Sequence, residues 1–131
     1  MATTEEILAD YIEAQVSTET VYVGQMPEEP DVVTVVRQYG AGASDLGFGV
    51  DGIQFEHPGI QVRCRGAAED WEGPRARIEA IYQLLPKIQG ATVGGVVFQL
   101  VKPQSAPFEL ERDDGLRSVH TVSFLVDKEP T

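Results

Sequence analysis

The strongest constraint on the fold is a short alternating strand that leads directly into an amphipathic helix. Every second residue of the strand is apolar: Ile60, Val62 and Cys64. This two-residue period is typical of a strand with one buried face. Residues 67–85 follow with an apolar stripe at helical spacing: Trp71, Ile78, Ile81, Tyr82 and Leu85. Facing apolar surfaces on a strand and on the next helix predict a layered α+β domain.

Prolines indicate where this helix begins and ends. A glycine–proline pair that ends at Pro74 would weaken a helix interior. The regular helix therefore either starts near Pro74, or starts near Ala67 and is kinked. Pro86 marks its predicted end. Arg75 and Glu79 have i,i+4 spacing, so we expect them to pair on the exposed side.

The rest of the chain predicts one more helix and five more strands within a single domain, residues 1–131. Thr3 or Thr4 can cap a helix at about residues 4–16. The further strands are expected at residues 20–23, 32–39, 93–101, 108–112 and 116–126. A β-branched run at 32–36 favours a central strand that is covered on both faces. The order α-β-β-β-α-β-β-β predicts an α+β fold with a mixed, mostly antiparallel sheet and two main helices.

Glycine and proline separate these elements. Residues 40–52 contain five glycines and predict a long flexible loop, which is either functional or a disordered surface segment. Residues 53–55 are expected to begin an extended segment. His57-Pro58-Gly59 predicts a turn, and Asp113-Asp114-Gly115 predicts a hairpin. A frayed tail is expected over residues 127–131.

The charge distribution limits the classes of partner. The chain has 131 residues with 10 Lys+Arg and 21 Asp+Glu, a net charge of −11. Eight acidic residues and no Lys or Arg precede Arg37, so that segment carries −8 of the charge. This balance argues against a protein that grips nucleic acid through its phosphates, but it is compatible with one that surrounds DNA without binding it. No apolar run approaches the roughly 20 residues of a membrane span, and the first residues do not resemble a signal peptide.

A cysteine–histidine pair is the catalytic arrangement that most needs testing. Cys64 is the only thiol, and His57 and His120 are candidate bases. Cys64, however, shares the predicted inward face with Ile60 and Val62, and a buried cysteine is usually a core residue. We therefore expect no catalytic residue and no enzymatic activity.

The sequence also predicts no metal site and no cofactor. Two distant histidines do not form a ligand set. Carboxylates near the last hairpin lack the spacing of a calcium loop: Glu111, Asp113, Asp114 and Asp127. The glycines of residues 40–52 match neither a phosphate-binding loop nor a dinucleotide motif.

Two arginines occupy the polar side of the alternating strand. Arg63 and Arg65 share one face of that strand in an otherwise acidic chain. They indicate either a solvated sheet face with local ion pairs or a subunit interface. Arginine is enriched at interfaces because its planar fork makes two parallel hydrogen bonds.

Three motifs, in order along most of the chain, resemble the minor capsid and tail terminator (tail completion) proteins of tailed phages. The first, residues 21–31 with the Tyr39-Gly40 that follows, resembles a strand ending in Gly, a Pro-x-x-Pro-Asp loop and a strand leading to Tyr-Gly. The second, residues 57–65, resembles the family's Pro-Gly-x-Gln-Val-x-x-Arg strand, and residues 81–85 resemble its helix end. The third, residues 107–115, resembles a Pro-Phe-x-Leu-x-Arg-Asp-x-x-Gly hairpin. Two departures are Leu116, which separates Gly115 from Arg117, and Ser123, where the family often has Asn.

The resemblance implies a structural virion protein without enzymatic activity. Such proteins form a ring, typically a hexamer, at the head-proximal end of a long tail. The ring ends polymerisation of the tail tube and presents a surface to the head–tail connector, while DNA passes through the lumen without specific binding. The implied partners are further copies of the chain, the tail tube protein and the connector protein. A head–tail adaptor or stopper is the nearest alternative, and a small ligand-binding α+β domain is a more distant one.

Two hypotheses follow for the contacts of such a ring. In the first, the Arg63 and Arg65 face, or the arginines of the second helix, meets the acidic N-terminal segment of the next subunit. The candidate interface residues are Arg63, Arg65, Arg75, Arg77, Glu6, Asp10 and Glu13. In the second, residues 40–52 become ordered against the tube or the connector.

Overall fold

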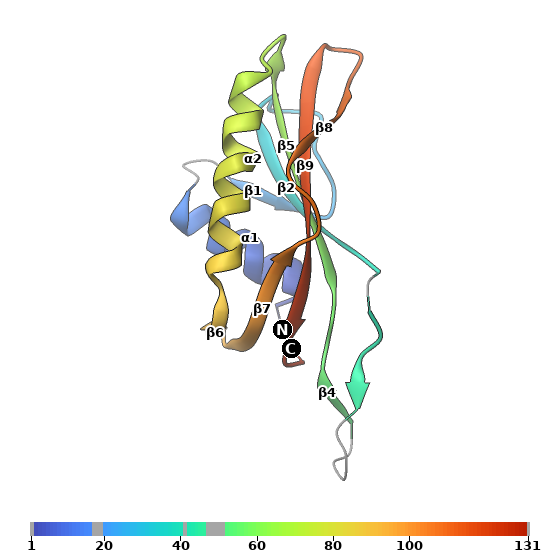
Figure 1. Ribbon diagram of the computed structural model, residues 1–131. Coiled ribbons are helices and arrows are strands. Elements are labelled where there is room, and N and C mark those ends of the chain that lie inside the picture. Colours follow the sequence, from blue (N-terminus) through green and yellow to red (C-terminus); the bar gives the residue numbers. More distant parts are fainter. Residues whose placement is uncertain (1, 17–19, 41, 47–51, 131) are drawn as a thin grey trace.

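Two helices lie on one face of a curled mixed sheet in this computed structural model, which describes residues 2–16, 20–40, 42–46 and 52–130 (Figure 1). The helices are α1 (Thr4–Gln15) and α2 (Glu72–Leu84), and α2 continues into the short 3₁₀ helix η1 (Leu85–Lys87). The main sheet contains β1 (Val21–Val23), β2 (Val33–Tyr39), β5 (Gly59–Ala68), β6 (Gln89–Val93), β7 (Val96–Pro103), β8 (Phe108–Arg112) and β9 (Arg117–Lys128). A separate hairpin contains β3 (Asp45–Leu46) and β4 (Ile53–Phe55). The predicted α+β fold with two main helices is confirmed.

The two long strands β5 and β9 form the middle of the sheet. Its strand order is β1-β2-β5-β9-β7-β6, and β8 also pairs with β9. β1 runs parallel to β2, whereas the other pairings in the described sheet are antiparallel. β8 pairs with the first half of β9 and β7 with its second half, so these two strands follow one another along the same side of β9.

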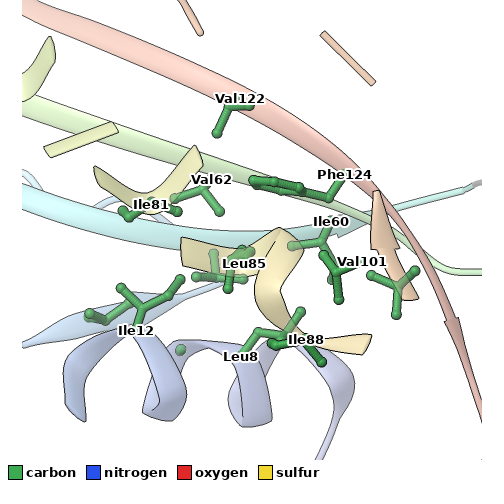
Figure 2. Packing of buried hydrophobic residues seen from close by; sticks show 14 of the residues in the cluster. Leu8, Ile12, Ile60, Val62, Ile81, Leu85, Ile88, Val101, Val122 and Phe124 are labelled. Carbon is green, nitrogen blue, oxygen red and sulfur yellow. The ribbon is translucent and has the colours of Figure 1, made fainter. Parts of the chain in front are cut away.

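The hydrophobic core lies between the sheet and the helices. The inward residues of β5 are completely buried as predicted: Ile60, Val62 and Cys64. Val122, Phe124 and Val126 of β9 extend the same surface. Leu8 and Ile12 of α1 and Ile81 of α2 close it from the other side (Figure 2). Two-sided burial of β2 is also confirmed, because Val33, Thr34, Val35 and Val36 are all buried.

Both helix starts follow local chemistry. Thr3 caps α1 in a reciprocal capping box, in which its hydroxyl accepts from the Glu6 amide and the Glu6 carboxylate accepts from Thr3. α2 begins at Glu72 and places Pro74 in its first turn, where a missing N–H costs nothing. The regular helix therefore starts near Pro74. Trp71 was wrongly placed in the buried stripe, because it precedes α2 and is 44% exposed.

The prediction of one strand over residues 93–101 was wrong. The chain forms a hairpin there, with β6 ending at Val93 and β7 starting at Val96. Gly94 and Gly95 make the turn with φ of +58° and +80°. Positive φ at both central residues is what a tight two-residue hairpin turn requires, and glycine adopts it without strain.

Two further expectations are corrected next to β9. Residues 57 and 58 do not form a turn: Glu56 makes a backbone bridge to Lys128, and the Pro58 carbonyl accepts from the Val126 amide. The frayed tail starts later than expected, because β9 continues to Lys128 and the Glu129 amide donates to the Val97 carbonyl. An extended strand pair holds each segment, so neither is a free loop.

The predicted loop over residues 40–52 is partly ordered. β3 and β4 pair as an antiparallel hairpin, here called the arm, that extends away from the rest of the domain (Figure 1). Residue 41 and residues 47–51 of the predicted loop lie outside the described residues.

Candidate interaction surfaces

The cysteine–histidine pair lies inside the core. Cys64 and His120 are cross-strand partners on β5 and β9, and both are completely buried. Burial lowers the pKa of His120, which favours its neutral form. Its Nε2 lies 2.9 Å from the Ser118 hydroxyl, which donates to Glu109, and its ring meets Trp71 edge-on. A thiol without solvent access cannot serve as a nucleophile for an external substrate.

Carboxylates of the last hairpin shape the turn itself. Asp113 accepts hydrogen bonds from the Gly115 and Arg117 amides, as the predicted hairpin requires. These bonds, with that from the Arg117 amide the largest cause, lower the pKa of Asp113. In the part of the chain that the structure describes, no group of three or more His, Cys, Asp or Glu side chains is arranged to hold a metal ion. No helix in that part is long and apolar enough to cross a membrane.

Arg65 is buried and binds its own chain. Its side chain has 4% exposure and donates to the backbone carbonyls of Glu28, Pro30 and Asp31 at 2.8–3.0 Å. Arg117 completes the anchor by bonding the carboxylates of Glu28 and Asp31 at 2.9 and 3.1 Å. The two arginines thus fix the Pro-x-x-Pro-Asp loop against the end of the sheet, a role that the sequence did not reveal.

The arginines of α2 also have partners within the chain. Arg77 donates to the Arg65 carbonyl at 2.6 Å. Arg75 pairs with Glu79 at 3.1 Å, which confirms the predicted i,i+4 pair, and its guanidinium lies 5.6 Å from the centre of the Trp71 ring. Arg63, the remaining predicted interface arginine, makes one side-chain hydrogen bond among the described residues, from its Nε to the Gln61 amide oxygen on the same strand.

The face of the sheet that α1 and α2 do not cover carries three cationic side chains besides the buried Arg65. Register pairs Arg37 with Gln61 across β2 and β5, and Gln61 with Ser123 of β9, so these side chains share one face. Arg63 lies two residues along β5 on that face, and Lys102 joins it through its pairing with Leu125. We call this surface, defined by Arg37, Arg63 and Lys102, the open face. None of these three side chains forms an ion pair within the described residues.

The outer side of α1 carries the opposite charge. Glu6, Asp10 and Glu13 are exposed at i, i+4 and i+7, and we call these three residues the α1 stripe. Hydrogen bonds from Thr3 lower the pKa of Glu6. Glu13 accepts a bond from the Val21 amide at 3.2 Å. All three expected acidic residues are therefore on the surface, although two of them also stabilise the fold.

His57 joins the arm to the end of β9. Its Nε2 lies 2.8 Å from an Asp45 oxygen in β3, and its Nδ1 lies 2.6 Å from an Asp127 oxygen in β9. Ionised carboxylates only accept hydrogen bonds, so both ring nitrogens must carry a proton to satisfy both partners. The hydrogen bond to Asp45, followed by that to Asp127, raises the pKa of His57. Glu56 and Lys128, which adjoin His57 and Asp127 in the sequence, pair with one another at 2.6 Å.

The pKa values of the two histidines are expected to shift in opposite directions from the ordinary value of about 6.5. The pKa of His57 is raised, so its contribution to stability is complete below the unfolded value and is lost as pH rises through the folded value. The pKa of His120 is lowered, so protonation at acid pH opposes folding. An NMR titration of the two imidazoles tests both directions in one sample. Asp45→Asn should move the His57 midpoint down and leave His120 unchanged; an unmoved His57 would contradict the proposed contact.

The fold and these surfaces define a small α+β structural domain with a cationic open face and an anionic helix stripe. A family model described as "Bacteriophage tail terminator protein" matches residues 7–130. The chain belongs to this tail terminator family. A solved structure matches 97% of the chain and 91% of its own length with a TM-score of 0.56, at 15% identity, a likeness of fold alone. No curated protein sequence matches the chain.

Membership gives the broad role of the protein. Tail terminators are structural, non-enzymatic proteins of the phage particle, located in the tail and in contact with tail and head components. The resemblance found in the sequence motifs is therefore confirmed.

Proposed function

We propose that this protein forms a ring, typically a hexamer, that caps the head-proximal end of a long tail tube. The ring ends tube polymerisation and provides the surface on which the head connector docks. The observation that carries this proposal is the family match over residues 7–130, which spans nearly the whole chain. That family also favours a terminator over the alternative of a head–tail adaptor or stopper.

The charges of the protein support passage of DNA through such a ring. A net charge of −11 repels phosphates, so DNA could pass through the lumen without adhering. The three cations of the open face are too few to form a phosphate-binding groove. DNA is therefore cargo in this proposal, not a ligand.

Tail length tests the function. Particles made without this protein should contain tails longer than normal that do not join heads, as measured by electron microscopy. Added protein should restore both length and joining, and end views should show a ring with a central channel. Tails of normal length that only fail to join heads would instead indicate an adaptor or stopper.

We further propose that the arm contacts the tail tube or the connector in the assembled tail. The arm is its own two-stranded sheet, and Leu46 in β3 is 77% exposed. Hydrogen exchange provides the test: the amides of β3 and β4 should exchange at least about tenfold more slowly on tails than in the free protein, because binding suppresses local opening. The amides of β5, in the middle of the sheet, serve as the internal control. Equal arm protection in both states would contradict the contact.

A further inference from the structure

We infer that the open face of one subunit binds the α1 stripe of the next subunit, a contact that closes the proposed ring. This inference rests on the proposed function and names the two surfaces that such an assembly would use. It differs from the expectation for Arg63 and Arg65 in one respect: Arg65 is occupied inside its own subunit, and Arg37 and Lys102 take its place.

The open face is covered by neither helix, and although Val35 beside Arg63 is buried, Arg37 and Lys102 are exposed there. Both helices pack on the other side of the sheet, against β2, β5 and β9 (Figure 1). Arg37 and Arg63 approach each other with like charge, and burial followed by the charge of Arg37 lowers the pKa of Arg63. Glu111 is the carboxylate that offsets this repulsion, but it forms no ion pair with Arg63. Two neighbouring arginines that form no direct ion pair with the described residues would be stabilised further by an acidic surface.

The α1 stripe supplies an acidic surface with the same number of charges. It presents three carboxylates over two helical turns, and α1 contains no Lys or Arg. Asp10, in the middle of the stripe, has no hydrogen bond or ion pair with the described residues. Three cations on the open face therefore face three anions on the stripe, which is charge complementarity between two copies of one chain.

The positions of the two surfaces require a contact between subunits. The open face and α1 lie on opposite sides of the sheet, so they cannot meet within one subunit (Figure 1). A contact between two different surfaces of identical chains is heterologous, and repeating it produces a ring when the rotation between subunits closes, as the proposed function requires. The arrangement leaves the anchored loop at residues 28–31 and the arm free for other partners.

Charge reversal on each surface tests the contact. Arg37→Glu/Arg63→Glu reverses the open face, and Asp10→Lys/Glu13→Lys reverses the stripe. Lys87→Glu/Arg112→Glu makes the same change in net charge as the first variant at exposed cations elsewhere, so it is the matched control. Because Glu13 also bonds the Val21 amide, Asp10→Lys alone is a second stripe variant that leaves this bond intact. Thermal melting verifies that each variant is folded.

Assembly is measured by sedimentation of the free protein and by ring occupancy on tail tubes. The second measurement tests the contact even if the free protein is a monomer. Each reversal should weaken assembly by roughly tenfold or more, since like charges that face each other at an interface are strongly unfavourable. The control should assemble normally. A mixture of the open-face and stripe variants should assemble again, because each contact in an alternating ring then joins opposite charges.

Three results would overturn the inference. A folded open-face or stripe variant could assemble normally, the mixture could fail to recover, or the open-face variant could keep its ring but lose attachment to tubes. The last result would assign the open face to the tube protein. In each case, tail length measured with the unmodified protein still tests the proposed function. Failure of this inference can therefore be distinguished from failure of the proposed function.

Discussion

Glu56→Ala is expected to destabilise the domain by about 3 kcal/mol, because it leaves the ammonium group of Lys128 buried without a counter-charge. The Lys128 side chain has 1% exposure, and its Nζ donates to Glu56 at 2.6 Å and to the Glu129 carbonyl at 3.1 Å. Loss of a buried partner usually costs about 3–5 kcal/mol. The lower end applies here because the Glu56 carboxylate is 32% exposed and water can approach. Urea denaturation followed by circular dichroism measures the change.

The comparison variants separate charge burial from simple loss of contact. Glu56→Leu/Lys128→Met removes both charges and keeps apolar volume, so it should fold with a stability close to that of the unmodified protein. Glu79→Ala breaks the exposed pair with Arg75 and should cost less than about 1 kcal/mol. A cost for Glu56→Ala as small as that for Glu79→Ala would show that Lys128 is hydrated or has another partner.

The sequence predicted the centre of the fold because its periodic patterns are strong there. Alternation at Ile60, Val62 and Cys64 correctly identified the buried side of β5. It failed at residues 93–101, because the β-branched residues on both sides of Gly94-Gly95 outweighed a glycine pair that is itself a signal for a two-residue hairpin. The number of strands depended on giving this glycine pair more weight than the β-branched run.

The charged residues were harder to predict because their roles depend on contacts distant in sequence. Alternation placed Arg65 on the polar side of its strand, which suggested an exposed interface residue. Its partners Glu28, Pro30 and Asp31 precede it by more than 30 residues, and they turn the arginine into an internal anchor. His57 likewise bonds Asp127 from the far end of the chain. Periodicity does not reveal contacts between residues so far apart in the sequence. The sequence therefore predicted that these charged side chains matter, but not which partners they bind.

The placement of α2 on the sheet depends on Gly66 in β5, a residue whose role periodicity does not predict. A Cβ atom there would lie 2.7 Å from Pro74 Cδ, 2.8 Å from Pro74 Cγ and 2.8 Å from the Asp70 carbonyl oxygen. A proline ring and a backbone carbonyl cannot rotate away as a flexible side chain would. The first turn of α2 would have to move, and with it the core contacts of Ile78 and Ile81.

Gly66→Val should therefore destabilise the domain by about 3 kcal/mol, at the upper end of the usual cost of overpacking. Gly40→Ala is the matched control: nothing lies within 4 Å of the added Cβ, so its effect should stay below about 0.5 kcal/mol. Pro74→Ala in the Gly66→Val background should recover part of the loss, because it removes one of the two rigid neighbours. Equal stability of Gly66→Val and Gly40→Ala would mean that α2 can shift freely over β5. The helix would then not hold the sheet in a fixed shape, and an open face with fixed positions for Arg37, Arg63 and Lys102 would lose its structural basis.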